Sequence, residues 1–333
     1  MSTKIRINVL AEFHEGPWGG GNQFLKALRD EFIRMDCYES DPEKGDVILF
    51  NSHHRLKEIV ELKRKYSDKI FVHRVDGPIS YRGEKGKKID RTIFTVNSLV
   101  ADGTVFQSSW SRLESHKQGL KENNYKRVIH NASDPEIFYP VIQERKHLLG
   151  KIKLIATSWS TNLGKGFDIY HYIDENLDFN KYEMTFIGRT DERFVNIHMI
   201  EPVPSMELAR RLREHDIFIF SSMQEACSNS LLEALHSGLP AVARSTSSNP
   251  EILGKAGEVF YGENDILEKI DLVANHIDDY RNKIDVLSLV EVGQMYYYFC
   301  EEIFYEVQRK DYIPKKQNYF DYMKMKFFCS SFG

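Results

Sequence analysis

The sequence of 333 residues contains only four cysteines, no long apolar run and no low-complexity tract. Cys37, Cys227, Cys300 and Cys329 stand too far apart for a zinc knuckle or a small disulfide framework. No apolar stretch has the length of a membrane-spanning helix, and the N-terminus lacks the apolar core of a signal peptide. We therefore expect a globular protein of the reducing cytoplasm, whose contact with a membrane surface, if it has one, is peripheral.

Two further absences concern binding partners. The net charge is -4, so the composition gives no reason to expect nucleic acid as a partner. No Asp-x-Asp triplet occurs, although carboxylates commonly hold Mg²⁺ against the phosphates of a substrate. The sequence therefore indicates no metal site, and we expect the protein to need no metal or other cofactor.

Short apolar runs that predict buried strands alternate along the chain with segments whose apolar residues recur at helical spacing. This alternation runs from Ile5 to Ile129, stops at a charged segment over residues 139–151, and restarts at Lys153. Strands that alternate with helices predict parallel sheets covered by helices. We therefore predict an α/β fold of two Rossmann-like, doubly wound domains, with residues 1–140 in the first, 141–305 in the second, and a final helix and tail over 306–333.

The stretch from Ile217 to Ala243 predicts a strand, a polar loop, a helix and a further strand. Glu225 falls in the loop and Glu233 in the first turn of the helix. A helix that starts beyond the carboxyl end of a parallel strand presents free backbone N–H groups, and α/β proteins bind phosphates there. Here those donors would belong to Ser228, Asn229, Ser230 and Leu231.

The two carboxylates of this stretch allow different interpretations. Ser230 and Glu233 have the spacing of a capping box, in which the Glu side chain only closes the helix start. Glu225 is harder to explain structurally, because a carboxylate beside an anion-binding helix start repels phosphate. It would be useful there if it faced another group, such as the hydroxyls of a sugar.

The string from Asp216 through Glu225 and Glu233 to Pro240 resembles the donor-site signature of glycosyltransferase family 4, the glycosyl transferases group 1. The resemblance implies that Glu225 faces the donor sugar, that Glu233 binds the ribose hydroxyls, and that the loop amides between them hold the diphosphate. One departure is clear: after Glu225 the family usually has Gly, and often Pro, whereas this chain has Ala, Cys and Ser.

Two groups in the first half also fall at predicted strand ends. One is a glycine loop, Gly19, Gly20 and Gly21, which could equally be an ordinary turn. The other is His73 with Asp76, which could be a core histidine and an Asp-Gly turn. The resemblance implies that the glycine loop lines the cleft between the domains, and that His73 and Asp76 lie near the transferred sugar as catalytic residues.

In the second half, Lys165 enters a helix beyond a strand end, where a lysine can bind a diphosphate as a point charge. The family has an Arg at the position of Ser160, so one expected positive charge is missing. Asn162 or Arg189 would then have to serve as the second contact. Arg189 follows a predicted strand, but it could also be an ordinary surface residue.

Two segments raise the question of a membrane. The lysine-rich stretch from Tyr81 to Arg91 predicts a solvated, mobile loop, with attraction to an anionic lipid or a phosphorylated acceptor as the second interpretation. The chain ends in a basic tail from Tyr312 to Phe328 that is rich in Tyr and Phe. For the final helix and this tail we favour docking on the first domain over a membrane role, since the resemblance implies a final helix that crosses back.

The resemblance implies a GT-B fold, with both domains facing a central cleft, and a retaining, metal-independent glycosyltransferase of polysaccharide biosynthesis. The donor would be a nucleotide diphosphate sugar carrying a hexose, and the acceptor a glycan, a lipid-linked sugar or another hydroxyl compound. Two alternatives stay open: a nucleotide-sugar-binding protein without catalysis, and a nucleotide-sugar epimerase. The sequence does not reveal the nucleotide base, the sugar, the acceptor or the oligomeric state.

Overall fold

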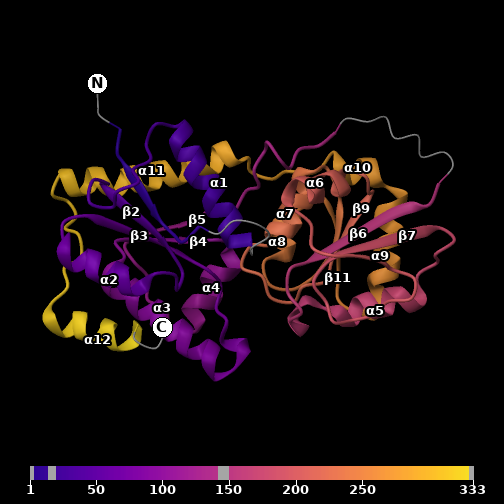
Figure 1. Ribbon diagram of the computed structural model, residues 1–333, viewed down its shortest axis with the longest axis horizontal. Helices are drawn as coiled ribbons and strands as arrows, with labels where there is room; N and C mark the ends of the chain where they lie inside the picture. The colour runs from indigo at the N-terminus through magenta and orange to yellow at the C-terminus, as the bar shows by residue number, and fades with distance from the viewer. Residues whose placement is uncertain (1–3, 14–19, 142–149, 330–333) are drawn as a thin grey trace. The chain divides into compact units, whose positions relative to one another are not determined.

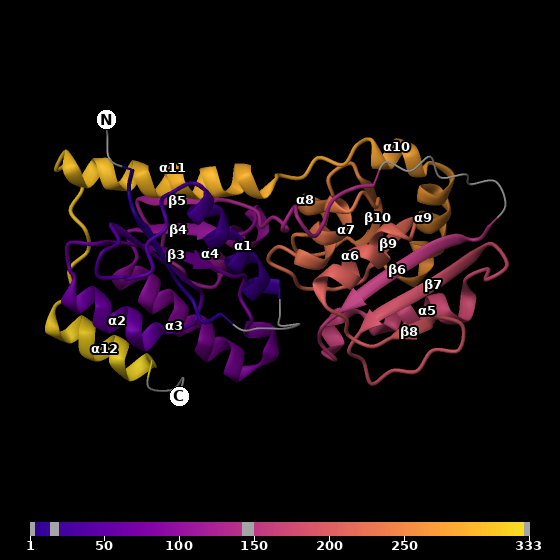
Figure 2. The same ribbon diagram turned by 45° about the horizontal axis from the view of Figure 1, so that its top comes forward.

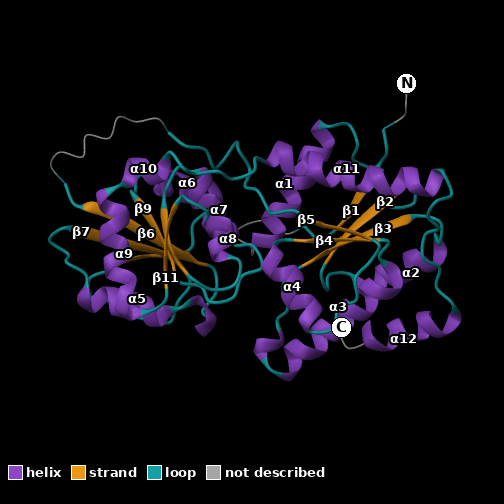
Figure 3. Ribbon diagram, turned by 180° about the vertical axis from the view of Figure 1, so that it is seen from behind, coloured by secondary structure: helices purple, strands orange, loops and turns teal. Residues whose placement is uncertain are grey.

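The computed structural model describes residues 4–13, 20–141 and 150–329. The chain divides into two compact units. The first unit takes in Met1–Phe13, Leu25–His130 and Leu289–Gly333, and the second takes in His14–Phe24 and Asn131–Ser288. Whereas we placed the end of the second domain at residue 305, the structure groups the chain with the first unit again from Leu289. Each unit is a parallel sheet between two layers of helices (Figure 3).

The first unit is built on five parallel strands that lie side by side in chain order. Tyr38 adds a single parallel bridge to Ile7 on the free side of the first strand. After the first strand the chain passes to one side of it, at the bridge of Tyr38. It then crosses to the other side, where the remaining four strands follow, as in doubly wound sheets. The strands are β1 (Ile7–Leu10), β2 (Val47–Asn51), β3 (Ile70–Val75), β4 (Gly103–Phe106) and β5 (Tyr125–Val128).

Helices lie on both faces of this sheet (Figures 1 and 2). On one face, α11 (Leu289–Gln308) packs against Gly103, where an added Cβ would come within 2.6 Å of Ile303. On the other face, α2 (Leu56–Lys65), α3 (Glu84–Val100) and α12 (Tyr319–Cys329) share one apolar core with Phe50 and Phe71. The unit also contains the part of α1 (Gly20–Arg34) that begins at Leu25. The helix α4 (Ser109–Lys117) and the short η1 (Ser80–Arg82) belong to it as well.

The second unit contains six parallel strands in the order β11-β10-β9-β6-β7-β8. Its middle strands are apolar and buried, since helices cover both of their faces. The strands are β6 (Ile152–Ser158), β7 (Tyr182–Gly188), β8 (His198–Ile200), β9 (Ile217–Phe220), β10 (Ala241–Arg244) and β11 (Gly257–Phe260). Because β7 and β9 flank β6, the order of the strands reverses between β6 and β9.

Alternate residues of these strands pack into two separate apolar cores, one on each face of the sheet. Phe218 and Phe220 of β9 face the core under α6 (Ser205–Arg213), α7 (Asn229–His236) and α8 (Asn249–Leu253). Ile217 and Ile219 face the core under α5 (Phe167–Asn176), α9 (Glu263–Asn275) and α10 (Ile277–Arg281). The short η2 (Leu163–Lys165) precedes α5. This alternation is the two-residue period of a strand that is buried on both sides.

One stretch is helical where we expected a loop. The lysine-rich segment after Tyr81 forms the first turns of α3, which begins at Glu84, and Ile93 and Val96 of this helix are buried. The buried Asp90 carboxylate accepts the N–H of Ile79, which fixes the turn before the helix. Burial of one apolar face therefore outweighs the charge that suggested a loop. The tail over 306–333, where we predicted a helix, contains α12.

The described cysteines are free and buried in the structure. Burial raises the pKa of the Cys37 and Cys329 thiols to about 11, because the interior penalises the thiolate. They are therefore inert residues of the core. Among the described helices, none is both long and apolar enough to cross a bilayer.

Candidate functional site

The candidate site lies at the carboxyl ends of β6 and β9, where the strand order of the second sheet reverses. Ligands of open α/β sheets bind at such switch points, since the loops of the two strands turn away from each other there. Gly166 joins η2 to α5 with a φ of 75°, and an added Cβ would meet the Ser221 carbonyl oxygen at 2.2 Å. Only glycine therefore allows the loop after β6 to approach the loop after β9 this closely.

The two loops are joined by an ion pair between Lys165 and Glu225. Lys165 Nζ lies 2.6 Å from Glu225 Oε1, and the Ser222 hydroxyl donates to the same oxygen over 2.6 Å. The side chains are 29% and 19% exposed, so the pair is sheltered but accessible from solvent. The structure thus brings together two of the residues predicted to hold the donor, from positions 60 residues apart.

The backbone of Glu225 is held from a third loop, the one after β10. Its N–H donates to Ser247 Oγ over 3.0 Å, and its carbonyl oxygen accepts from Ser248 Oγ over 2.8 Å. Asn249 extends this support by donating to the Ser222 carbonyl oxygen over 2.8 Å. The sequence analysis missed these three supporting residues, although the polar run after β10 was a usable signal. Glu225 is therefore fixed by its neighbours before any ligand binds.

The start of α7 differs from the predicted capping box. The cap is Ser228, whose hydroxyl accepts the N–H of Leu231 over 3.3 Å, and Ser230 and Glu233 lie inside the helix. The capping-box interpretation of Ser230 with Glu233 is therefore wrong, because the helix begins two residues earlier. Of the four predicted donors, Leu231 already has a partner in Ser228, and Asn229 and Ser230 are the N–H groups of the first turn that point out of the helix.

The side chain of Asn131 fixes this helix start from outside. Its Nδ2 donates to Asn229 Oδ1 over 2.9 Å and to the Cys227 carbonyl oxygen over 3.4 Å. The Asn131 N–H also donates to the Cys227 sulfur over 3.4 Å. Cys227, which is buried, is thus an anchor of the loop. The contact of Asn131 with α7 was not predicted from the sequence.

Glu233 is a buried carboxyl one turn into α7, with 8% of its surface exposed. Among the residues that the structure describes, none donates a hydrogen bond to it. Burial alone raises its pKa to about 8, because the interior penalises the carboxylate. A buried acid without a partner is destabilising, and such groups occur preferentially where a ligand completes them.

The remaining donor-side predictions have mixed outcomes. Ser160 and Asn162 shape the loop after β6: Ser160 Oγ accepts the Asn162 N–H over 3.2 Å, and Asn162 Oδ1 accepts the Gly164 N–H over 2.9 Å. Both therefore support the turn that presents Lys165. Arg189 lies at the end of β7, at the same edge of the sheet, with an exposed side chain.

In the first unit, His73 does not lie at a strand end. It sits within β3, fully buried, and its ring stacks on Phe50 with centroids 4.1 Å apart. Its Nε2 donates to the Ser52 carbonyl oxygen over 2.9 Å, and its Nδ1 accepts from Asn97 Nδ2 over 3.1 Å. Burial lowers its pKa to about 4. The prediction of an accessible strand-end histidine is therefore wrong, since both ring nitrogens are used in the core.

Asp76 does lie just beyond β3. It accepts from Arg74 Nη1 over 3.1 Å and from the side chain of Gln107, and its own side chain is 38% exposed. Gly19 lies outside the described residues. Gly20 and Gly21 begin α1, and an added Cβ at Gly21 would meet none of the described residues within 4 Å.

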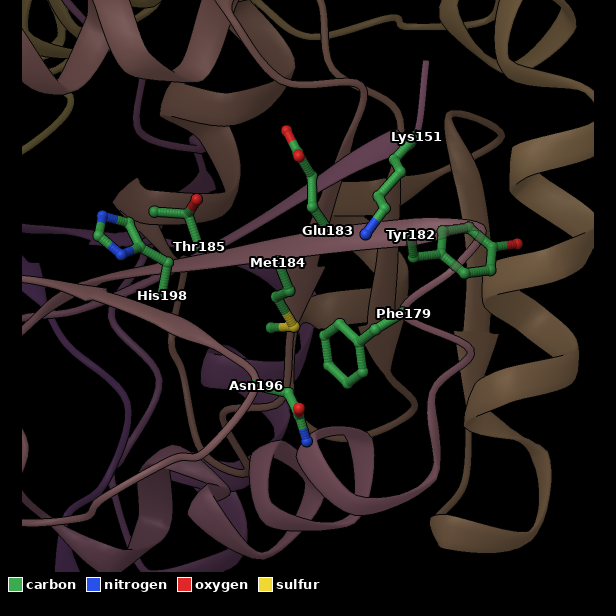
Figure 4. Close-up of a pocket in the computed structure, with 8 residues that line it drawn as sticks. All are labelled: Lys151, Phe179, Tyr182, Glu183, Met184, Thr185, Asn196 and His198. Atoms are coloured by element: carbon green, nitrogen blue, oxygen red, sulfur yellow. The ribbon is translucent and has the colours of Figure 1, made fainter. Parts of the chain in front are cut away.

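A cavity of about 330 Å³ opens elsewhere on the second unit (Figure 4). It lies along the first half of β7, before β8 begins to pair with that strand at Thr185. This is the amino end of the sheet, the opposite end from Lys165 and Glu225, so the cavity is separate from the candidate site. Its lining is Lys151, Phe179, Tyr182, Glu183, Met184, Thr185, Asn196 and His198.

Residues 174–279 match the model of the family described as glycosyl transferases group 1, a range that includes Glu225 and Glu233. A comparison with curated protein sequences finds no significant match.

Solved structures with the same fold cover nearly the whole chain. Sucrose-phosphate synthase from Thermosynechococcus elongatus is 12% identical, with a TM-score of 0.64 over 92% of this chain and 98% of its own. HepE from Anabaena, in complex with UDP, is 12% identical, with a TM-score of 0.62 over 92% and 99%. The lipopolysaccharide outer core galactosyltransferase WaaB is 11% identical, with a TM-score of 0.60 over 92% and 100%.

The sequence resemblance and the predicted fold class are thus confirmed. The chain has the GT-B fold of the glycosyltransferases, and its second unit carries the match to the glycosyl transferases group 1.

Proposed function

We propose that the protein is a retaining, metal-independent glycosyltransferase that moves a hexose-type sugar from a nucleotide diphosphate sugar to a hydroxyl acceptor. The observation that carries this proposal is the Lys165–Glu225 pair at the switch point of the second sheet, close in sequence to the start of α7. It supplies a cation for a leaving diphosphate and an anion for a sugar, on two loops in contact.

The chemistry of glycosyl transfer needs both kinds of charge. A departing diphosphate gains negative charge, which Lys165 and the N–H groups of Asn229 and Ser230 would stabilise. When Lys165 turns to the diphosphate, Glu225 loses one of its two donors and becomes free to accept hydroxyls of the sugar. The oxocarbenium-like character of the reacting sugar is also favoured by a nearby carboxylate. Protein groups would thus neutralise the leaving group without a metal.

Glu233 would bind the ribose of the donor. Its carboxyl is buried and has no donor among the described residues, so two ribose hydroxyls would satisfy it. Structures with the same fold support a nucleotide donor, since those of HepE contain UDP and UDP-glucose. A TarM structure contains UDP together with Fondaparinux and α-GlcNAc-glycerol, which supports glycan or glycan-like acceptors.

The first unit would serve the acceptor, a glycan, a lipid-linked sugar or another hydroxyl compound. Asp76 is an accessible carboxylate just beyond β3, held by Arg74. The buried His73 would act only as a positioning residue, through its hydrogen bond to the Ser52 carbonyl oxygen in the loop after β2. A lipid-linked acceptor would bring a cytoplasmic enzyme of polysaccharide biosynthesis to a membrane surface.

A second candidate function is nucleotide-sugar binding without transfer. Ser160 favours it, because this residue shapes its own loop and adds no positive charge where the resembled family has Arg. An epimerase of the same architecture is the third candidate. The three differ in products: a transferase makes a glycoside, an epimerase changes the sugar without an acceptor, and a binding protein leaves the donor intact.

The test uses the purified chain and a panel of nucleoside diphosphates and their sugars. A nucleotide at one hundred times its dissociation constant should stabilise the fold by about 2.7 kcal/mol and raise the melting temperature by a few degrees. With the best donor, the release of nucleoside diphosphate and the transfer product are measured. A protein that no nucleotide stabilises would contradict the proposal.

Glu225→Gln is the decisive variant, with Glu183→Gln on the exposed part of β7 as its matched control. Removal of one charge that stabilises a transition state typically costs about a hundredfold to a thousandfold in turnover. We expect Glu225→Gln to lose at least about a hundredfold in turnover and to keep the melting temperature of the wild type. Glu183→Gln should behave as wild type in both measurements. Full turnover in Glu225→Gln would exclude the assigned role.

A further inference from the structure

The helix α12 carries large apolar side chains on two opposite faces. Tyr322, Met325 and Cys329 are buried in the core that α12 shares with α2 and α3. On the other face, Phe320 and Phe327 are 82% and 75% exposed. A helix that only docked on the first unit would need the first face alone.

The exposed residues form a stripe. Phe320, Met323 and Phe327 are three and four positions apart, so they lie above one another along one side of the helix. Tyr319 extends the stripe at the start of the helix and is 65% exposed. Exposed single apolar residues are normal, but four within one helix of eleven residues form a contiguous patch of the kind that marks an interaction surface.

Positive charge borders this stripe. Lys324 is exposed beside Met323, and Lys316 and Lys326 have side chains 63% and 59% exposed. Lys316 and Lys326 each form one loose, exposed ion pair, at 3.6 Å from Asp68 and at 3.7 Å from Glu61, and among the described residues Lys324 has no such partner. From Tyr312 to Phe328 the sequence has four lysines and one aspartate. Lys315 points inward, where its Nζ donates to Ser98 and Asn123, so three of these lysines are available at the surface.

The core holds α12 in a fixed orientation. The Tyr322 hydroxyl donates to Glu61 over 2.6 Å, and the Arg64 guanidinium lies 4.1 Å from the centre of the Tyr322 ring. The segment before the helix is tied down as well, since the Tyr312 hydroxyl and the Lys315 N–H both donate to Asp102. Within the first unit, α12 lies on the side away from α11 (Figures 1 and 2). The stripe therefore faces outward on a firm support.

We propose that this face of α12 docks the protein on an anionic lipid surface. Aromatic and Met side chains enter the boundary between headgroups and acyl chains, while lysines beside them meet lipid phosphates. The exposed apolar stripe matches the apolar part of a lipid surface, and the lysines beside it match the negative charge of anionic headgroups. The inference does not depend on the proposed transfer reaction.

Vesicle co-sedimentation of the full chain tests this proposal. The vesicles are pure phosphatidylcholine or equal parts of phosphatidylcholine and phosphatidylglycerol. We expect binding to the anionic vesicles that weakens with salt, and little binding to the neutral ones. The double variant Phe320→Ser/Phe327→Ser should reduce the partition coefficient at least about tenfold, because each aromatic side chain contributes roughly that factor when it is buried.

Two controls accompany this variant. Val195→Ser/Tyr261→Ser removes two exposed apolar residues of the second unit and should bind as wild type. Lys316→Gln/Lys324→Gln should weaken binding and reduce its dependence on salt. Circular dichroism and the melting temperature confirm that each variant is folded.

Three outcomes would overturn the proposal. The wild type could fail to bind anionic vesicles, or it could bind them equally well after the α12 substitutions. Sedimentation velocity could instead show a dimer that Phe320→Ser/Phe327→Ser dissociates, in which case the stripe is covered by a second copy of the chain.

Discussion

Each unit of this protein has an ion pair that joins distant segments of the chain, and the two pairs differ in burial. In the first unit, Lys63 and Asp102 form an ion pair over 3.1 Å in which both side chains are completely buried. In the second unit, the closest pair at the switch point, Lys165 with Glu225, stays partly exposed. A buried pair that has all its partners serves the fold, whereas a pair open to solvent can exchange one partner for a ligand.

The surroundings of the two pairs explain the difference. Asp102 accepts four hydrogen bonds, from the N–H groups of Phe71 and Lys315, from Lys63 Nζ and from the Tyr312 hydroxyl. No position around it is left for a ligand. Glu225, in contrast, receives its two side-chain donors at Oε1 alone. The location of a charge in the fold thus decides whether it is structural or available.

The largest expected effect comes from breaking the buried pair. Lys63→Met should destabilise the protein by about 3 to 5 kcal/mol, because Asp102 would keep a buried charge without its cation. Urea unfolding followed by circular dichroism measures this. Lys65→Met on the same helix is the control: its ion pair with Glu43 is exposed, and no clear change is expected. Equal stabilities for the two variants would contradict the structural role of Lys63.

Glu233 provides the next test, because it is a buried carboxyl of the second unit that no described residue satisfies with a hydrogen bond. Its pKa of about 8 in the fold exceeds the ordinary value of 4.5, so the folded chain holds a proton that the unfolded chain loses between these pH values. Stability therefore falls as pH rises through this range. Glu233→Gln should remove the loss, with a gain at pH 8 on the order of 3 kcal/mol.

Unfolding of both proteins at pH 5 and pH 8 measures this gain, and Glu183→Gln serves as the exposed control. The gain should shrink when a bound nucleotide satisfies Glu233. A Glu233→Gln protein that loses stability with pH as steeply as wild type would show that this carboxyl is not the group responsible.

His73 gives a smaller effect with the opposite sign of pH dependence. His73→Gln should cost about 1 to 3 kcal/mol, because buried polar partners at Ser52 and Asn97 lose their geometry. The wild-type imidazole has a pKa of about 4 in the fold, below its ordinary 6.5, so the unfolded chain binds the proton first and stability falls as pH drops through this range.

The variant should lack this component of acid sensitivity when unfolding is compared at pH 7 and pH 4.5. His276→Gln, at an exposed position, is the matched control. An unchanged acid sensitivity in His73→Gln would exclude His73 as its source.

The smallest expected effect on stability concerns Lys165, the cation of the partly exposed pair. Lys165→Met breaks the partly exposed pair and should cost about 1 kcal/mol or less in stability. The same variant should lose most of its stabilisation by a nucleoside diphosphate in a thermal-shift experiment. A large loss of stability from Lys165→Met would make this pair structural and remove the contrast between the units.

The sequence predicted the fold better than the accessibility of single residues. The strand periodicity located the sheets, and the stretch around Glu225 located the switch-point loop. It misplaced His73 and the cap of α7, because a strand end or a helix start shifts by two residues without changing the local pattern. It also missed Ser247 and Ser248, which meet Glu225, and Asn249, which meets Ser222, because these contacts exist only where β9 and β10 are neighbours.

The sequence by itself determined the alternation of strands and helices, the two halves, and the residue types that glycosyl transfer needs. These properties depend on local spacing and side-chain chemistry. Only the tertiary structure decided that Lys165 meets Glu225, that Glu233 is buried with no donor among the described residues, and that His73 belongs to the core. Contacts between distant segments and the exclusion of water set these features, and both arise when the sheets and helices pack.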